Sequence, residues 1–236
     1  MNRHEKFDLV SRYLYPNVIK DLWFNVLEKH VAADSIVLEV GSGSGKGKQN
    51  INYPKAKRII GIDLDQRVLE NPYLDDAICG SAYEIEHYLS GQKVDVVYSH
   101  MVAEHIDDAE KFLVSQVNVL TEDGVILHST VSKYFWVSLI NNFVPEKVKN
   151  WLIKTLGSGR TSEDIFPALY QLNSEDQIKK LSEKYQLEYE LIRQDEPPGY
   201  LRRSIILMVL YTLFNKPLQF LFPSLRQTFI FKLRKK

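Results

Sequence analysis

Residues 37–47 read VLEVGSGSGKG, a short apolar run that ends in a cluster of glycines. Residues 35–40, SIVLEV, overlap its start and form a β-branched apolar run typical of a buried parallel strand that enters a tight turn. Glycine at Gly41, Gly43 and Gly45 lets backbone N–H groups approach a ligand closely and adopt angles that a side chain would forbid. The stretch therefore predicts a strand followed by a ligand-binding turn.

An acidic residue stands at the end of the next apolar run. Residues 59–65 read IIGIDLD and place Asp63 twenty-two positions after Gly41. A carboxylate at this point can accept hydrogen bonds from both ribose hydroxyls of an adenosine. The turn and Asp63 together predict an adenosine-containing ligand and disfavour a glycine-rich turn that binds nothing.

Spacing distinguishes between the nucleotide loops that such a turn could form. A dinucleotide fingerprint needs Gly or Ala three residues after its second glycine, where Lys46 stands. A P-loop carries a Gly-Lys pair with another glycine five residues before the glycine of that pair. For Gly45 and Gly47, which both precede a lysine, Val40 and Ser42 stand at that position. Both interpretations weaken, and a nicotinamide-dependent oxidoreductase becomes a distant alternative.

Strand and helix patterns alternate along the chain. Apolar runs at residues 58–62, 94–98 and 125–127 predict further buried strands, and residues 77–79 predict a weaker one. A helix is predicted between the last two strong runs from two aspartates and an apolar periodicity, carried by Asp107, Asp108, Ala109, Phe112, Leu113, Val117 and Leu120. This alternation predicts an α/β fold with a doubly wound, mostly parallel sheet.

The carboxyl-terminal part is expected to complete the sheet. Ser174 and Gln177 form a capping-box pattern before a helix, and residues 187–191 and 229–233 alternate like strands. Helical insertions are expected over the acceptor site and before the last strand. We expect a single domain over residues 1–236, with a cofactor-binding core at about 35–131, an aromatic lid at about 132–172, and a C-terminal helix, strands and basic apolar insertion at 173–236.

Three motifs in this order and spacing, VLEVGSGSG, IIGIDLD and VDVVYSHMVAEHI, resemble the consecutive motifs of class I S-adenosylmethionine-dependent methyltransferases. The resemblance is strongest to the small-molecule branch typified by quinone O-methyltransferases, and it covers residues 36–130. It implies a Rossmann-like methyltransferase fold, S-adenosyl-L-methionine as the cofactor, and methyl transfer as the activity.

The resemblance also implies which residues hold the cofactor. Glu39 and the glycines would hold the methionine moiety, Asp63 the ribose, and Leu64 would lie against adenine. An Asp often follows the third strand in this family and receives the adenine amino group, whereas Ser81 with Ala82 stands there in this chain. The expected cofactor contacts are Glu39, Gly41, Ser42, Gly43, Gly45, Asp63, Leu64, Ser81, Ala82 and His100, the last mainly through its backbone.

The segment after the fourth strand contains the candidate catalytic residue. The sulfonium already activates the methyl group, so the enzyme must mainly align a nucleophile and exclude water. A base adds to the rate where the acceptor is a hydroxyl or a protonated amine. His105 is the candidate base or acceptor contact, and family members often carry Glu-His here. The alternative is that His105 caps the next helix or orients Glu104.

Composition excludes several other classes. Cys79 is the single cysteine, so no internal disulfide forms, and the histidines lack metal-ligand spacing; no metal is expected. The amino terminus has charges where a signal peptide needs an apolar core, which predicts a cytoplasmic protein. The sequence SHMV replaces the Asn/Asp-Pro-Pro-aromatic motif of enzymes that methylate base amino groups, so no nucleic-acid partner is expected.

Charge is distributed unevenly along the chain. Residues 197–236 contain eight basic residues and no acidic one, whereas the rest carries 30 acidic and 22 basic residues. The apolar run at residues 205–214 has about half the length that spans a bilayer. Two interpretations stay open: a helical hairpin packed on the domain, or an interfacial segment at the inner face of a membrane, with Arg202, Arg203, Lys216 and Arg226 meeting anionic head groups.

The expected function is methyl transfer to a small-molecule or lipid-linked acceptor. A methyltransferase-like module that has lost catalysis and binds a partner or lipid is the alternative, because Ser81 departs from the family pattern. Aromatic residues of the insertion are expected to cover the acceptor or to pack in the core: Tyr134, Phe135, Trp136, Trp151, Phe166 and Tyr170.

Overall fold

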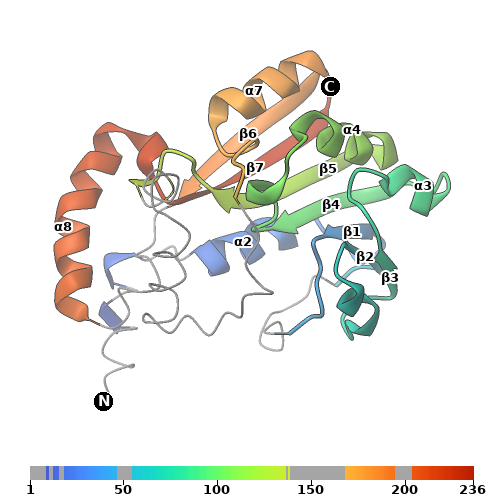
Figure 1. Ribbon diagram of the computed structural model, residues 1–236, viewed down its shortest axis with the longest axis horizontal. Helices are drawn as coiled ribbons and strands as arrows, with labels where there is room; N and C mark the ends of the chain where they lie inside the picture. The colour runs from blue at the N-terminus through green and yellow to red at the C-terminus, as the bar shows by residue number, and fades with distance from the viewer. Residues whose placement is uncertain are drawn as a thin grey trace.

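A single seven-stranded sheet organises the molecule (Figure 1). The computed structural model describes residues 9–10, 13–15, 19–46, 55–136, 138, 168–194 and 204–236. The strands are β1 (Ile36–Val40), β2 (Arg58–Asp63), β3 (Asp76–Cys79), β4 (Val94–His100), β5 (Leu120–Val131), β6 (Leu187–Gln194) and β7 (Thr228–Lys235). Their order is β3-β2-β1-β4-β5-β7-β6, and β7 alone runs in the direction opposite to the other six strands. The predicted doubly wound, mostly parallel sheet is confirmed.

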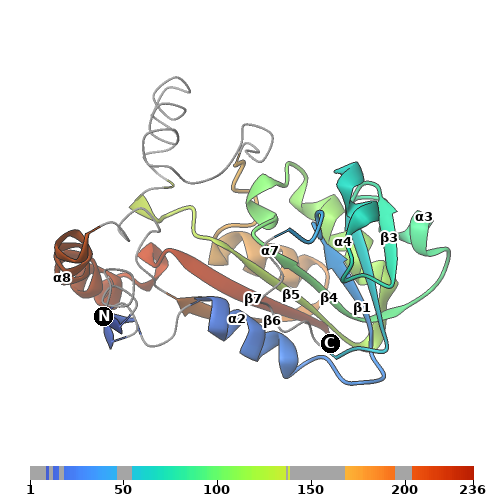
Figure 2. The same ribbon diagram turned by 90° about the horizontal axis from the view of Figure 1, so that it is seen from below.

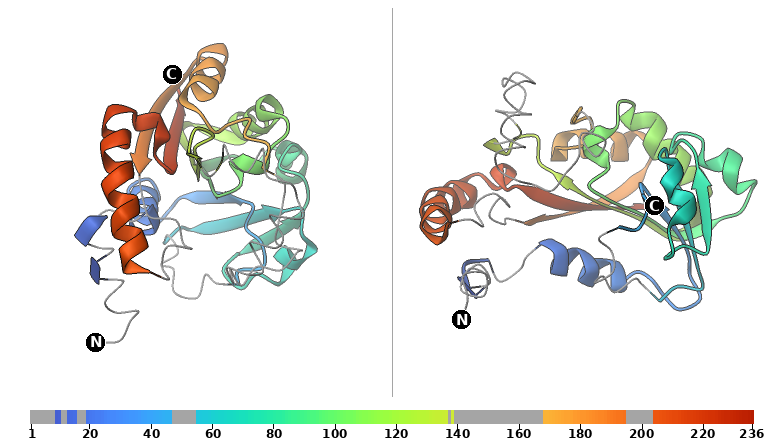
Figure 3. Two further views of the ribbon diagram at one scale, coloured as in Figure 1. Left: turned by 60° about the vertical axis from the view of Figure 1, so that its left-hand side comes forward. Right: turned by 60° about the horizontal axis from the view of Figure 1, so that its bottom comes forward.

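Helices cover both faces of this sheet. They are α2 (Ile19–Glu28), α3 (Ile85–Leu89), α4 (Ala109–Val119), α7 (Glu175–Lys184) and α8 (Ile205–Leu221), with 3₁₀ helices η1 (Gln66–Glu70), η2 (Ala103–His105) and η5 (Pro223–Leu225). Helices α3, α4 and α7 lie on one face and α2 on the other (Figures 1 and 2). Helix α8 stands at the end of the molecule toward which β4 and β5 point, opposite α3 (Figures 1 and 3).

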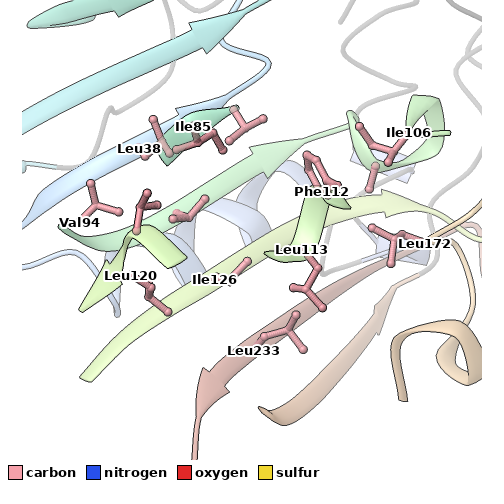
Figure 4. Packing of buried hydrophobic residues seen from close by; sticks show 14 of the residues in the cluster. Leu38, Ile85, Val94, Ile106, Phe112, Leu113, Leu120, Ile126, Leu172 and Leu233 are labelled. Atoms are coloured by element: carbon pink, nitrogen blue, oxygen red, sulfur yellow. The ribbon is translucent and has the colours of Figure 1, made fainter. Parts of the chain in front are cut away.

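Two apolar layers hold the helices on the sheet. Phe112 and Leu113 of α4 pack in a cluster that includes Leu38 and Ile126 of the central strands (Figure 4). On the other face, Trp23 and two neighbours of α2 pack against β1, β4 and β5. Burial of these side chains positions the carboxyl ends of the parallel strands along one edge, where such folds bind ligands.

The helix caps that the sequence predicted are present at the starts of α4 and α7. The Asp108 side chain caps α4 by accepting from the Lys111 amide at 2.9 Å. Ser174 caps α7 by accepting from the Gln177 amide. The Gln177 Oε1 accepts from the Asn173 amide at 3.1 Å, so the reciprocal bond of the capping box reaches one residue further back than usual.

Strand β5 begins five residues before the expected run at 125–127 because its start is irregular. Leu120 pairs with Val94, and the next pairing joins Val125 to Val96, so the four residues 121–124 of β5 bulge out opposite Asp95 of β4. The polar sequence TEDG at residues 121–124 lies in that bulge and resembles a turn.

The carboxyl-terminal insertion is one helix, so the expected helical hairpin is wrong for the residues described. Asn215, Lys216 and Pro217 interrupt the apolar run, yet α8 passes through them. Pro217 removes one backbone donor, and the Phe222 amide still bonds to the Leu218 carbonyl at 2.7 Å. None of the helices that can be described is long and apolar enough to cross a membrane.

The predicted aromatic lid at residues 132–172 falls mostly outside the described residues, as do Trp151 and Phe166. At its start, Phe135 is buried and packs at 5.6 Å from the ring of Trp136, which is 39% exposed. Tyr170, at its end, has a positive φ of 55°.

A buried polar network joins β4, β5 and α4. His128 is fully buried; its Nδ1 lies 2.6 Å from Ser99 Oγ and its Nε2 lies 2.8 Å from Gln116 Oε1. The Gln116 amide nitrogen donates to the Phe112 carbonyl, so Oε1 accepts from Nε2–H and Nδ1 accepts from the Ser99 hydroxyl. Burial lowers the pKa of His128 to about 3, which keeps the ring neutral.

This network predicts a pH dependence of stability. The unfolded chain protonates His128 near its ordinary pKa of 6.5, whereas the folded chain does not until about 3. The free energy of unfolding should therefore fall by about 1.4 kcal/mol for each pH unit below about 6.5 on account of this residue. Urea unfolding of the wild type and His128→Gln between pH 5 and 7.5 measures the difference in slope. Parallel pH profiles would contradict the assignment.

Candidate active site

The loop after β1 turns through three glycines of positive φ: Gly41 (+72°), Gly43 (+54°) and Gly45 (+72°). The Gly41 amide donates to the Ile62 carbonyl of β2 at 2.8 Å. A methyl group on Gly41 would lie 2.3 Å from Val102 Cγ2. The turn is therefore a tight backbone cradle at the carboxyl end of β1, as the sequence predicted.

Asp63 ends β2 directly beside this loop. Its Oδ2 accepts from the Gly43 amide at 2.8 Å, and its Oδ1 accepts from the Asp65 amide at 2.8 Å. Each carboxylate oxygen has a second lone pair, so both can still accept from ribose hydroxyls. The predicted proximity of the glycine loop and Asp63 is confirmed, and the ribose contact stays a prediction.

Asn71 fixes the same loop and was missed from the sequence. Its buried amide donates to the carbonyls of Ser42 and Gly43 at 3.2 and 3.0 Å. Its Oδ1 accepts from the Tyr73 amide and would lie 2.6 Å from a methyl group on Gly45. An asparagine 28 residues away in sequence gives no local signal that it holds the loop.

The expected adenine contacts follow the ends of β2 and β3. Leu64 is 75% exposed next to Asp63, a free apolar surface of the kind that an adenine ring covers. The Ser81 Oγ accepts from the Tyr83 amide at 3.2 Å, and the Ala82 carbonyl accepts from Ser115 Oγ at 2.7 Å. Because strands β2 and β3 pair in register, these residues lie at one edge.

The expected methionine side combines β1, β4 and helix α2. Glu39 and Ser42 are buried at the end of β1 and in the loop. His100 is exposed as the last residue of β4, and its ring stacks on Trp23 at 5.7 Å and 28°. Neither α2 nor Trp23 was predicted from the sequence; Trp23, Val26 and Leu27 show the apolar spacing that could have indicated a helix.

The segment between β4 and η2 has an unusual backbone. Met101 has a φ of +56°, a left-handed conformation that is uncommon for a residue with a side chain, and its amide donates to the Ser129 carbonyl at 2.8 Å. Such conformations persist where surrounding structure enforces them, and they concentrate at functional sites. The turn at Met101 joins the end of β4 to η2.

A hydrogen-bond chain anchors η2 next to the candidate base. The Thr130 hydroxyl donates to the Glu104 carboxylate at 2.8 Å and accepts from Asn173 Nδ2 at 2.7 Å. Glu104 is buried, so this bond satisfies a carboxylate that would otherwise be costly to desolvate. The chain fixes Glu104 and hence the backbone of half-buried His105.

The structure decides whether His105 caps helix α4. The residue that caps α4 is Asp108, so the interpretation that His105 caps this helix is wrong. Val102, at the start of η2, touches the glycine loop at Gly41, which brings η2 to the cofactor edge. The role of His105 as base or acceptor contact stays a prediction.

A further bond ties the β3 and β4 loops together. The Tyr83 hydroxyl donates to the Asp107 carboxylate and accepts from the Asp108 amide. Burial, followed by this bond, raises the pKa of Tyr83, and the same bond lowers the pKa of Asp107. The expected adenine side and the expected acceptor side are thus joined by a direct hydrogen bond.

A cavity of about 270 Å³ lies along the same sheet edge, at the ends of β5 and β6 and the start of β7. Arg193 and Glu175 form an ion pair at its wall, and the Arg226 guanidinium donates to the Arg193 carbonyl. The order of the strands places it beyond β5, on the side away from the glycine loop. No group of three or more His, Cys, Asp or Glu side chains within the described part of the chain could hold a metal ion.

Comparison with known proteins adds a family match over part of the chain and a fold. Residues 38–128 match the family model described as a methyltransferase domain. No match was found among curated proteins. This match spans the glycine loop, Asp63 and η2.

Solved structures share the whole architecture at low identity. A S-adenosylmethionine-dependent methyltransferase from Archaeoglobus fulgidus has 13% identity, coverage of 92% of this chain and 94% of that chain, and a TM-score of 0.55. The cyclopropane synthase MmaA2 from Mycobacterium tuberculosis has 17% identity, coverage of 91% and 83%, and a TM-score of 0.55. The plantazolicin methyltransferase BamL, solved with a triazolic desmethylPZN analogue and S-adenosylhomocysteine, has 15% identity, coverage of 98% and 90%, and a TM-score of 0.53. These likenesses establish the fold.

Proposed function

We propose that this class I S-adenosylmethionine-dependent methyltransferase transfers its methyl group to a small-molecule or lipid-linked acceptor at the carboxyl edge of the sheet. S-adenosylmethionine is the cofactor, and it supplies an electrophilic methyl group on a sulfonium. The site fits this cofactor, because a Cβ on Gly43 would meet only Asp63 Oδ2, at 3.9 Å, which leaves open space between the loop and this carboxylate.

The observation that carries the proposal is the direct packing of η2 on the glycine loop. Val102 touches Gly41, so His105, three residues later, stands on the same edge as the loop. The buried Glu104–Thr130–Asn173 chain holds this segment in place. His105 would accept the proton that a hydroxyl or ammonium acceptor loses, while the fixed loops align the acceptor and exclude water.

Two features favour a small or lipid-linked acceptor over a macromolecule. The sequence from Ser99 to Val102 lacks the proline-rich motif of enzymes that act on base amino groups, and residues 1–196 have an excess of acidic residues that opposes a nucleic-acid backbone. The resemblance of the three motifs to quinone O-methyltransferases supports a small acceptor of that general kind.

The proposal is tested by following a labelled methyl group. The protein is incubated with S-adenosylmethionine labelled on its methyl group and with aqueous or lipid extracts, and the label is located in small-molecule, lipid, protein and nucleic-acid fractions. We expect label in the small-molecule or lipid fraction, together with S-adenosylhomocysteine. Label confined to protein or nucleic acid would overturn the acceptor class, and cofactor binding without turnover would indicate a silent binding module.

Asp63→Ala is the control that links this activity to the site. The variant should bind S-adenosylmethionine about 1–3 kcal/mol more weakly, because the ribose hydroxyls lose a charged acceptor. Asp65→Ala changes a carboxylate two residues away and should leave the dissociation constant nearly unchanged. Calorimetry decides; equal affinities for wild type and folded Asp63→Ala would reject the ribose contact.

A further inference from the structure

Helix α8 presents its polar side to the protein and its apolar side outward. Met208, Tyr211, Thr212 and Gln219 are buried, and three of these four are polar. The outward side carries large apolar residues that are 46–82% exposed: Ile206, Leu207, Leu210, Leu213, Phe214, Leu218, Phe220 and Leu221, followed by Phe222. A surface helix of a soluble domain normally has the reverse arrangement, and apolar patches of this size mark interaction surfaces.

Specific polar contacts hold α8 in this orientation. The Thr212 hydroxyl donates to the Met208 carbonyl and forms a 2.8 Å hydrogen bond with the Tyr15 hydroxyl. The Lys216 ammonium donates to the Leu14 carbonyl and lies 5.0 Å from the centre of the Tyr15 ring. These bonds join α8 to residues 13–15, so turning its apolar face inward would break them.

The charges around α8 indicate the partner that its apolar face fits. From residue 197 to the end of the chain there is no acidic residue, and Lys216 and Arg226 lie on the helix and directly after it. Arg202 and Arg203 precede the helix in sequence and lie outside the described residues. An apolar helix whose charged neighbours in sequence are all cations matches an anionic lipid surface. A second copy of the same face would bring like charges together.

The place of α8 in the fold agrees with such a partner. Strands β4 and β5 point toward the end of the molecule at which α8 stands (Figures 1 and 3). Their carboxyl ends form the candidate active site. After the carboxyl end of α8, Pro223 and Ser224 of η5 line the cavity beyond β5. A membrane that contacts α8 therefore lies on the side of the active-site edge.

We propose that α8 is an interfacial helix that inserts its exposed apolar side into the head-group region of an anionic membrane without crossing it. Its buried polar side and Lys216 stay on the protein, and the cations that precede and follow the helix in sequence bind anionic head groups. The inference does not depend on the acceptor, because membrane binding can be measured without methyl transfer.

Vesicle co-sedimentation of the full chain tests the apolar contribution. The wild type should bind vesicles of phosphatidylcholine with about one-third phosphatidylglycerol, and Phe214→Gln/Phe220→Gln should weaken this binding by roughly tenfold for each ring. Both rings are exposed, at 71% and 82%, so the variant should fold. Leu69→Gln, at an exposed apolar residue of η1, is the matched control and should bind like the wild type.

The same assay tests the charge contribution. Arg202→Gln/Arg203→Gln should lower affinity for anionic vesicles about 25-fold, from about fivefold for each charge, and wild-type binding should weaken as salt is raised. Lys179→Gln/Lys180→Gln makes the same charge change on α7 and should have little effect. The proposal would be overturned if the wild type did not bind anionic vesicles. It would also be overturned if the aromatic and the arginine variants both bound them as tightly as the wild type. A stable dimer in sedimentation velocity that Phe214→Gln/Phe220→Gln dissociates would overturn it as well.

Discussion

Replacing His105 with alanine should lower turnover with the true acceptor by about 10²–10⁴-fold, the usual contribution of a positioned general base. Affinity for S-adenosylmethionine should change little, because the glycine loop, Asp63 and Asn71 hold one another without His105. The anchor of η2 should also survive, since it runs through the neighbouring Glu104 side chain to Thr130. Single-turnover kinetics and calorimetry together measure the two effects.

Chemical rescue separates a base from a structural histidine. Imidazole added to His105→Ala should restore part of the lost turnover if the side chain moves a proton, and it should do nothing if the histidine only packs. His87→Ala, at an exposed histidine of α3, is the matched control and should keep full activity. Full activity of His105→Ala, or loss of cofactor binding without loss of turnover at saturation, would contradict the assigned geometry.

Short-range patterns account for the parts of the fold that the sequence predicted. Each central strand is a mostly apolar run because it is buried on both faces. The caps of α4 and α7 depend on residues three positions apart, Asp108 with Lys111 and Ser174 with Gln177. The contact between the glycine loop and Asp63 follows from the pairing of β1 with β2 in a parallel sheet, so spacing alone sufficed.

The parts that the sequence did not predict depend on contacts between distant residues. Asn71 holds a loop 28 residues away, and Asn173 reaches Thr130 across 43 positions. His100, at the end of β4, stacks on Trp23 of helix α2. No local pattern encodes these pairs, because each side chain becomes useful only after the sheet has brought the two segments together.

Helix α8 shows a different limit. The sequence identified its apolar run but not its continuity as one helix. Asn215, Lys216 and Pro217 interrupt the hydrophobic residues and resemble the turn of a hairpin. Which side faces the protein was decided by Thr212 and its bond to Tyr15, nearly two hundred residues away. The consequence is an exposed apolar surface that periodicity alone assigns to the core.

Gly41→Ala should be among the most damaging single substitutions in the chain, with a loss of about 2–5 kcal/mol in the free energy of unfolding. Alanine at φ +72° costs about 1–2 kcal/mol. Its methyl group would also lie 2.3 Å from Val102 Cγ2, and overpacking of this kind costs about 1–3 kcal/mol. Urea unfolding measures the stability, and calorimetry measures the cofactor affinity that the displaced loop should lose.

Two variants separate the backbone cost from the steric cost. Gly91→Ala has the same problem of positive φ, at +88°, with no atom within 4 Å of the added methyl group, so it should cost about 1–2 kcal/mol alone. Val102→Ala removes the atom that Gly41→Ala would strike, so the double variant should be less destabilised than the sum of the single ones. Because Val102 starts the 3₁₀ helix that carries His105, relief of the clash should restore turnover as well as cofactor binding. Equal losses for Gly41→Ala and Gly91→Ala would mean that the two loops do not touch, and the contact that joins the cofactor cradle to His105 would have to be abandoned.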